Sequence, residues 1–275
     1  MQALVFDFNG TMFLDTDKQR KAWDEFFVRY IGRPLTQEEF LRHACGPDAS
    51  MVIRHFCHAP LDEARIAAMT EEKEVIYRRL CREDRERFCL APGLPEALDR
   101  LQARGVPMAI ATGAGRGNLE FYFEAFHLER WFDWQHIVYD DGTLPGKPAP
   151  DVYLRACARL GVAPQDAVIF EDAFAGIESA NAAGAGAIVA ITATNPASAL
   201  AALPGVRAVI DDYRDLDAVI FEDAFAGIAS AHAAGAGAIV AITATNPASA
   251  LANLPGVKAV IDDYRDLDAV LSRLC

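Results

Sequence analysis

The sequence predicts an α/β fold in which a parallel sheet carries helices on both faces and a helical unit is inserted after the first strand. Three observations support this prediction. Apolar runs alternate with helical patterns from Pro92 onward. A short apolar run, Ala3–Phe6, precedes them and ends at Asp7. The stretch between Asp15 and Arg87 is rich in charge and helix formers and shows no strand-like alternation. Alternating strands and helices form right-handed βαβ units, whose strands lie parallel.

The first strand is followed at once by a turn that contains Asn9 and Gly10. Asp and Asn favour such a bend and Gly supplies a positive φ, so turn chemistry alone accounts for these residue types. In an open α/β sheet, however, ligands bind beyond the carboxyl ends of the strands. Asp7 stands at such an end, where its side chain can project into a site.

Four successive helices are expected in the inserted stretch, which predicts a small helical bundle. Apolar residues at helical spacing, Trp23, Phe26, Phe27 and Tyr30, predict the first helix over 17–31. Trp23 and the two phenylalanines are expected in the bundle core. Thr36 with Glu39 three residues later is a capping box, which opens the second helix. The remaining two helices are expected over 49–57 and 61–82.

Strands and helices alternate in the rest of the chain. The apolar runs predict strands over 107–111, 135–139, 167–170 and 187–191. Helical patterns between them predict helices over 94–104, 119–126 and 151–160.

The C-terminal part contains a near-identical repeat. Residues 169–219 recur as 220–270 with four changes: Glu178 to Ala229, Asn181 to His232, Ala202 to Asn253 and Arg207 to Lys258. Stacking arrays need about three or more repeats, so two copies do not indicate a solenoid. A repeat this similar indicates a recent duplication, an engineered duplication or a sequence-assembly error. Resequencing the source DNA across Val219 and Ile220 would separate these origins.

Composition limits the kinds of partner. The hydrophobic content of 52% and the charged content of 24% are typical of a globular protein. The net charge of −13 disfavours binding to nucleic acid or to anionic membranes. No apolar run reaches the ~18 residues that span a bilayer, and no secretory signal is visible. The six cysteines show no zinc spacing, so we expect free thiols and a cytoplasmic protein.

Polar side chains follow four of the expected strands. These are Asp7, Thr112, Lys147 and the pair Glu171-Asp172. Clustered carboxylates repel one another unless a cation joins them, and oxygen ligands without His or Cys suit Mg²⁺. A hydroxyl and an ammonium beside that metal suit a phosphoryl group, and an Asp carboxylate can act as a nucleophile towards it.

These residues belong to four motifs that resemble those of the haloacid dehalogenase-like superfamily, in its phosphatase and β-phosphoglucomutase-like branch. The motifs are Asp7-Phe8-Asn9-Gly10-Thr11, Ala111-Thr112-Gly113, Gly146-Lys147-Pro148-Ala149-Pro150 and Phe170-Glu171-Asp172-Ala173-x-x-Gly176-Ile177. The resemblance extends to about Val219. It implies a Rossmann-like core (1–15 and 90–219) and a helical cap (16–89), with 220–275 extending or packing on the core.

The resemblance also implies the metal site and the phosphate site. Asp7 would be the nucleophile and a Mg²⁺ ligand, the backbone carbonyl of Asn9 a second ligand, and Asp172 with Glu171 would complete the set. Thr112 and the Gly113 amide would hold phosphate oxygens, and Lys147 would neutralise charge between Asp7 and the phosphoryl group. Possible substrate contacts are Arg42, Arg54 and Arg116.

Asn9 departs from the family pattern, because phosphatases of this branch usually carry Asp there as general acid and base. A neutral amide has no ionisable proton near neutral pH, and general acid–base catalysis is typically worth ~10²–10⁴ in rate. We expect a slow phosphatase, a substrate with a good leaving group, or a proton from another residue such as His43 or His55. The dehalogenases also lack this Asp, but they use no metal, whereas Glu171-Asp172 favours one.

The first hypothesis is a Mg²⁺-dependent hydrolase of a small phosphorylated metabolite. A mutase is a weaker alternative, since the cap loop that is basic in such members contains Asp48 here. Another alternative is a non-catalytic protein that binds a phosphorylated ligand on the same scaffold, in which Asn9 replaces the catalytic acid. We expect the first copy of the repeat to complete the site, because helix 151–160 directly precedes its strand. The surplus copy is expected to extend the sheet edge, pack alongside it or pair with another chain as a homo-oligomer.

Overall fold

The computed structural model describes residues 3–44, 49–57, 60–214, 220–222, 239–242 and 257–261. The chain forms two compact units. The first comprises Met1–Ala91 and Leu98–Asp211, and the second comprises Pro92–Ala97 and Asp212–Cys275.

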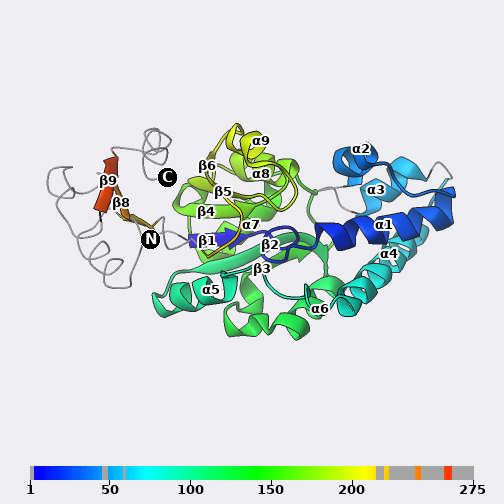
Figure 1. Cartoon of the computed structure of the whole chain (residues 1–275), viewed down its shortest axis with the longest axis horizontal. Helices are drawn as coiled ribbons and strands as arrows, with labels where there is room; N and C mark the ends of the chain where they lie inside the picture. The colour runs from blue at the N-terminus through cyan, green and yellow to red at the C-terminus, as the bar shows by residue number, and fades with distance from the viewer. Residues whose placement is uncertain are drawn as a thin grey trace. The chain divides into compact units, whose positions relative to one another are not determined.

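A six-stranded parallel sheet forms the centre of the first unit, with the strand order β3-β2-β1-β4-β5-β6 (Figure 1). Its strands are β1 (Ala3–Phe6), β2 (Met108–Gly115), β3 (Ile137–Asp140), β4 (Ala167–Glu171), β5 (Ala187–Ile191) and β6 (Val206–Ile210). In the centre of the sheet, Val5 lies opposite Ala109 on one side and Ile169 on the other. The predicted α/β class and Rossmann-like sheet are confirmed.

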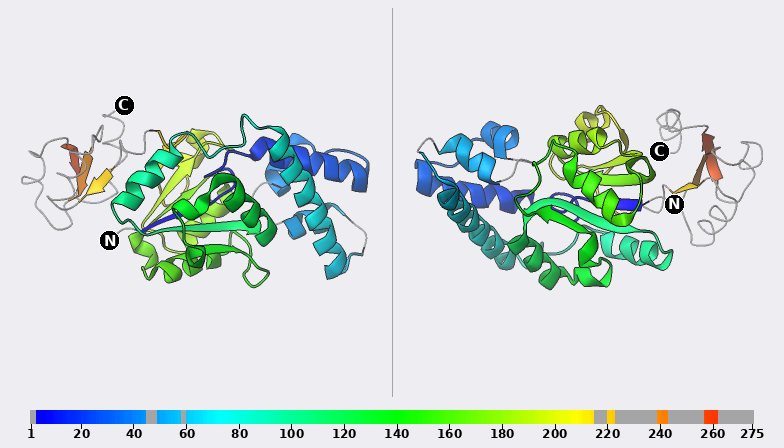
Figure 2. Two further views of the ribbon diagram at one scale, coloured as in Figure 1. Left: turned by 90° about the horizontal axis from the view of Figure 1, so that it is seen from below. Right: turned by 180° about the vertical axis from the view of Figure 1, so that it is seen from behind.

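Side chains alternate between the two faces of the sheet along each strand. Both faces are buried, because helices cover each of them. Val5 and Ile169 pack on one face in a cluster with helices α7 (Asp151–Leu160), α8 (Phe174–Ala182) and α9 (Ala197–Ala201). On the other face Phe6 stacks on Phe170 with ring centroids 4.6 Å apart. The views in Figure 2 show helices on both sides of the sheet, including α5 (Leu94–Ala103) and α6 (Arg116–Phe126).

The inserted helices have their own hydrophobic core. They are α1 (Thr16–Ile31), α2 (Gln37–Glu39), α3 (Ala49–Phe56) and α4 (Glu63–Glu83), with a π-helical turn at Phe40–Ala44. The expected aromatic core is confirmed, since Trp23, Phe26 and Phe27 are buried and Tyr30 packs against them. Both hydrogen bonds of the Thr36–Glu39 capping box are present. The predicted boundaries between core, cap and C-terminal segment stay a prediction.

Several element ends differ from the sequence-based expectation, most of all around β2, α6 and β3. Strand β2 continues beyond Ala111 to Gly115, which pairs with Asp140 after an irregularity in register. Helix α6 therefore starts at Arg116, directly after that strand, rather than at residue 119. Strand β3 begins at Ile137 rather than at 135. Strand pairing decides these ends, and the local apolar pattern does not contain that information.

The second unit contains a three-stranded sheet built from the repeated segment. Its strands β7 (Ile220–Glu222), β8 (Ile239–Ile242) and β9 (Val257–Ile261) lie in the order β7-β8-β9. Their pairing, Ile220 with Ile239 and Ile239 with Val257, repeats that of the first copy, Ile169 with Ile188 and Ile188 with Val206. Of the strands that the two copies contribute to the described residues, β4 of the first copy is the one that pairs with β1. An oligomer formed through the second copy stays a prediction.

None of the helices in the described ranges has the length and apolar character needed to cross a bilayer.

The pairing of β4 with β1 predicts unequal effects of the same substitution in the two copies. Ile169 is fully buried between β1 and β5, so Ile169→Ala is expected to lower the free energy of unfolding by ~2–5 kcal/mol. The matched change Ile220→Ala in the separate sheet should leave that transition unchanged. Urea denaturation followed by tryptophan fluorescence measures it, because all three tryptophans belong to the first unit. Equal losses for the two variants would contradict the assignment of the first copy to the sheet.

Candidate active site

Asp7 is held at the carboxyl end of β1, in the middle of the sheet. Its backbone N–H donates to the Phe170 carbonyl at 3.0 Å, which extends the ladder between β1 and β4 by one bond, and the residue is only 6% exposed. Gly10 turns the chain after it with a φ of +79°. A Cβ atom at Gly10 would lie 2.2 Å from Oδ2 of Asp172, so this position accepts only glycine without displacing that carboxylate.

Lys147 joins two of the carboxylates. Its Nζ donates to Oδ1 of Asp7 and to Oε1 of Glu171, both at 2.6 Å, and its side chain is 8% exposed. Burial opposes the charge on this ammonium, but the negative charges of Asp7 and Glu171 and the hydrogen bonds to them raise the pKa of Lys147 overall. The ammonium is therefore a fixed positive charge beside Asp7.

Glu171 is fixed from several sides at the end of β4. Its Oε1 also accepts from the Tyr153 hydroxyl at 2.9 Å, and its Oε2 accepts the backbone N–H groups of Asp172 at 2.8 Å and Ala173 at 2.9 Å. A Cβ atom at Gly176 in helix α8 would lie 1.6 Å from Oε1 of Glu171. Gly176 therefore makes room for this carboxylate, which in turn positions Lys147.

Asp172 is a buried carboxylate without a cationic partner among the described residues. It accepts from the hydroxyls of Thr11 and Thr194 and is 3% exposed. Burial, with repulsion from Glu171 and Asp7, raises the pKa of Asp172 well above its usual range. Burial likewise raises the pKa of Asp7 to about 7, although Lys147 lowers it.

The chemistry of this cluster fits a divalent cation. Carboxylate oxygens of Asp7, Glu171 and Asp172 all lie within 4.8 Å of one another. A divalent ion would remove the repulsion that raises the pKa values of Asp7 and Asp172. A donor set made only of oxygen suits Mg²⁺.

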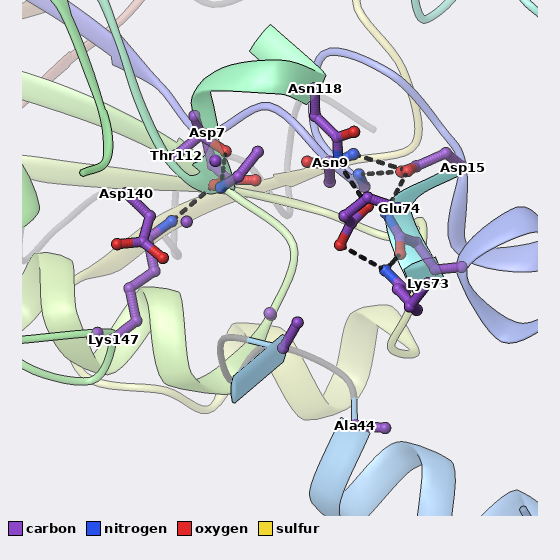
Figure 3. A pocket seen from close by; sticks show the side chains of 18 of the residues that line it. Asp7, Asn9, Asp15, Ala44, Lys73, Glu74, Thr112, Asn118, Asp140 and Lys147 are labelled. Atoms are coloured by element: carbon purple, nitrogen blue, oxygen red, sulfur yellow. Dashed lines mark hydrogen bonds and ion pairs between the residues drawn. The ribbon is translucent and has the colours of Figure 1, made fainter. Parts of the chain in front are cut away.

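Eight of the residues singled out from the sequence line one cavity of about 360 Å³: Asp7, Asn9, Thr112, Gly113, Arg116, Lys147, Glu171 and Asp172. Figure 3 shows Thr112 next to Asp7 in this cavity, with Lys147 reaching towards them. Thr112 is 2% exposed, and its Oγ1 accepts the backbone N–H of Ala114 at 3.1 Å. That bond leaves the proton of the Thr112 hydroxyl free to be donated to a ligand.

The side chain of Asn9 joins a buried polar cluster of its own. Its Nδ2 donates to Oδ2 of Asp15 at 2.7 Å and to the hydroxyls of Tyr122 at 2.8 Å and Tyr77 at 3.2 Å. Asp15 also accepts the Gly10 N–H at 2.9 Å and is 1% exposed. Burial raises the pKa of Asp15, and the hydrogen bonds from Tyr77 and Asn9 oppose that rise.

The two histidines considered as proton sources lie elsewhere. The rings of His43 and His55 stack at 4.2 Å, and neither residue lines the cavity. Arg42 and Arg54 are also absent from the lining and pair with Glu38 and Glu63. Of the possible substrate contacts, Arg116 alone lines the cavity, where Glu120 accepts from it at 2.7 Å. The loop 45–48, which bears on the mutase alternative, lies outside the described residues.

The structure adds lining residues that the sequence reasoning missed: Asp15, Lys73, Glu74, Arg78 and Asn118. Lys73 carried a usable signal. The buried residues of α4 recur at helical spacing, Ile66, Met69, Lys73, Tyr77 and Cys81, and a lysine within such an apolar stripe indicates a buried charge with a partner. Asn118 carried no such signal, because its hydrogen bonds to Arg78 and Glu74 form only where α4 approaches α6.

Known proteins show the same organisation. The family model of haloacid dehalogenase-like hydrolases matches residues 1–184. The chain is 32% identical to protein CbbY of Rhodobacter capsulatus, over 67% of this chain and 82% of that one. It is 32% identical to hexitol phosphatase A of Escherichia coli, over 66% and 80%. The crystal structure of a hydrolase of this family (family IA, variant 3) from Entamoeba histolytica superimposes with a TM-score of 0.72 at 33% identity, covering 78% of this chain and 95% of that one. The chain belongs to the haloacid dehalogenase-like hydrolases.

Proposed function

We propose that this protein is a Mg²⁺-dependent phosphatase that hydrolyses a small phosphorylated metabolite through a covalent intermediate on Asp7. The observation that carries the proposal is the single cavity in which Asp7, Asp172, Lys147 and Thr112 meet. Negative and positive groups converge there as the transfer of a phosphoryl group requires. The similarity to a relative named as a hexitol phosphatase supports the same reaction class.

Asp7 and Asp172 are the side chains that would hold the ion, with the backbone carbonyl of Asn9. When bound, Mg²⁺ would neutralise charge on the phosphoryl oxygens. Both oxygens of Glu171 already accept hydrogen bonds from Lys147, Tyr153 or backbone N–H groups. Its place as a direct ligand stays a prediction, and its hydrogen bonds support a role in positioning Lys147.

The contact with Lys147 distinguishes the two oxygens of Asp7. Oδ1 accepts from Lys147, so Oδ2 is the oxygen available to attack phosphorus. The Thr112 hydroxyl and the Gly113 N–H would hold phosphoryl oxygens during the attack. The bond from phosphorus to the ester oxygen breaks and the alcohol leaves. Water then attacks the phosphoryl group on Asp7, which releases inorganic phosphate and restores the carboxylate.

Asn9 determines how the departing alcohol gains its proton. The amide hydrogens of Asn9 point to Asp15 and the two tyrosines, and an amide cannot transfer a proton near neutral pH. The departing oxygen would then take its proton from water. Substrates whose leaving group is a weak base suffer least from this loss.

A metal-removal experiment tests the cation site. EDTA is expected to abolish phosphate release and Mg²⁺ to restore it. Asp172→Asn should abolish both turnover and Mg²⁺ binding measured by calorimetry. Asp223→Asn, the matched change in the second copy outside the described residues, should leave both nearly intact. Full turnover in excess EDTA would reject the phosphatase and favour metal-free chemistry.

Replacing Asn9 with Asp should increase turnover of alkyl phosphates more than that of aryl phosphates, by ~10-fold or more. The new carboxylate would lie about 2.7 Å from the buried carboxylate of Asp15, and two such groups share one proton near neutral pH. That proton would serve as the general acid for the leaving group. Comparing kcat for an alkyl and an aryl monophosphate in the two proteins measures the effect. A uniform gain, or none, would show that protonation of the leaving group does not limit turnover.

Asn9 also favours one alternative, a non-catalytic protein that binds a phosphorylated ligand on the same scaffold. An activated aryl phosphate separates the two functions, because its leaving group needs no general acid. Phosphate release that disappears in Asp7→Asn supports the phosphatase. Binding of phosphate without any release, in both wild type and variant, supports the binding protein.

A further inference from the structure

Two cationic side chains stand on the cap side of the cavity, and each is already held by a carboxylate. Lys73 on α4 is 3% exposed, and its Nζ donates to Oε1 of Glu74 at 3.0 Å and to Oε1 of Gln19 at 2.6 Å. Nζ also lies 4.9 Å from the centre of the Trp23 ring. This ammonium is enclosed by its partners.

Arg78 lies five residues after Lys73 on α4. Its Nη2 donates to Glu71, and its Nη1 donates to Oδ1 of Asn118 at 2.8 Å. Asn118, at the start of α6, in turn donates from Nδ2 to Oε2 of Glu74 at 2.6 Å and is 4% exposed. The hydrogen bonds therefore form one connected chain from Lys73 through Glu74 and Asn118 to Arg78. Figure 3 shows Lys73, Glu74 and Asn118 together on the side of the cavity away from Lys147.

The positive charges that line the cavity within the described ranges are paired with carboxylates. Arg116 pairs with Glu120 and Lys147 with Asp7 and Glu171. Every cation that lines the cavity within the described ranges therefore has a carboxylate partner, and carboxylates outnumber cations in the lining. One Mg²⁺ at Asp7 and Asp172 would offset charge at the reacting phosphate and would not reach the cap side.

We propose that the paired charges Lys73–Glu74 and Arg78–Glu71, joined through Asn118, make the cavity selective for a monophosphate whose remaining part is uncharged and hydroxylated, and reject a bisphosphate. The inference rests on the proposed phosphatase and names its substrate class. Hydroxyl groups suit this surface, because Glu74 accepts hydrogen bonds, Asn118 donates them, and Lys73 offsets the charge of Glu74.

Rejection of the bisphosphate follows from electrostatics. A second phosphate carries a charge of about −1.5 to −2 and would enter beside the carboxylates of Glu74 and Glu71 while losing water. Its approach would have to break the existing ion pairs. Repulsion between like charges in a partly buried site should lower kcat/KM for the bisphosphate by ~10-fold or more relative to the monophosphate.

Matched substrates test the inference: glucose 6-phosphate against glucose 1,6-bisphosphate, and fructose 6-phosphate against fructose 1,6-bisphosphate. The expected ratio of kcat/KM, monophosphate over bisphosphate, is at least ~10. Glu74→Gln leaves Lys73 without its carboxylate and should lower the ratio ~5-fold or more. Glu83→Gln is the matched control, since Glu83 is also on α4 and pairs with Arg79 outside the cavity, and its ratio should be unchanged.

A wild-type ratio near or below one would overturn the inference, as would a ratio that moves in neither Glu74→Gln nor Glu71→Gln. Glu71 is exposed, so Glu71→Gln decides the matter if thermal melting shows that Glu74→Gln does not fold. If no monoester is hydrolysed, the proposed phosphatase fails and selectivity is still measurable. Calorimetric binding of the same pairs to Asp7→Asn should then favour the monophosphate, and equal or tighter binding of the bisphosphate would overturn the inference.

Discussion

Three buried carboxylates and one buried lysine at the carboxyl ends of β1 and β4 are the constraint on which the rest of this site depends. Like charges at this separation raise one another's pKa values, so the arrangement persists only where cations and hydrogen-bond donors meet it. Lys147 neutralises part of the charge, and Gly10 and Gly176 leave the space that the carboxylates fill. Asp172 has no cationic partner among the described residues, so a metal ion would balance its charge.

A second polar network links the reacting end of the cavity with its cap side. It begins at Asn9, where Asp15 accepts from the amide, and Gln19 donates to the same carboxylate at 3.1 Å while accepting from Lys73. Asn118 then carries the chain of hydrogen bonds onto α6. Because buried polar groups need every partner, these contacts hold the inserted helices α1 and α4 against α6 beside the cavity. The same residues therefore hold the inserted helices in place and line the cavity.

The repeated segment shows how little of this site is local. Its strands pair in the same register as those of the first copy, and its sequence contains the same Glu-Asp pair after the strand. The carboxylate cluster of the candidate site includes Asp7 as well, and a sheet has one position for a strand beside β1 on that side. The first copy takes it among the described strands, because β4 follows α7 through a short connection. The same pair of residues in the sequence of the second copy therefore does not by itself define a site.

The sequence by itself determined the α/β class, the inserted helices with their aromatic core, and the side chains at the strand ends that meet in the cavity. It could do so because hydrophobic periodicity and the geometry of parallel sheets are local rules that place strand ends at one edge. Only the tertiary structure decided that Asn9 is tied to Asp15 and the two tyrosines, that His43 and His55 stack away from the cavity, and that Lys73 and Arg78 are already neutralised. These facts depend on how α4 approaches α6 and the turn after β1. Such contacts join residues far apart in the chain, and packing alone brings them together.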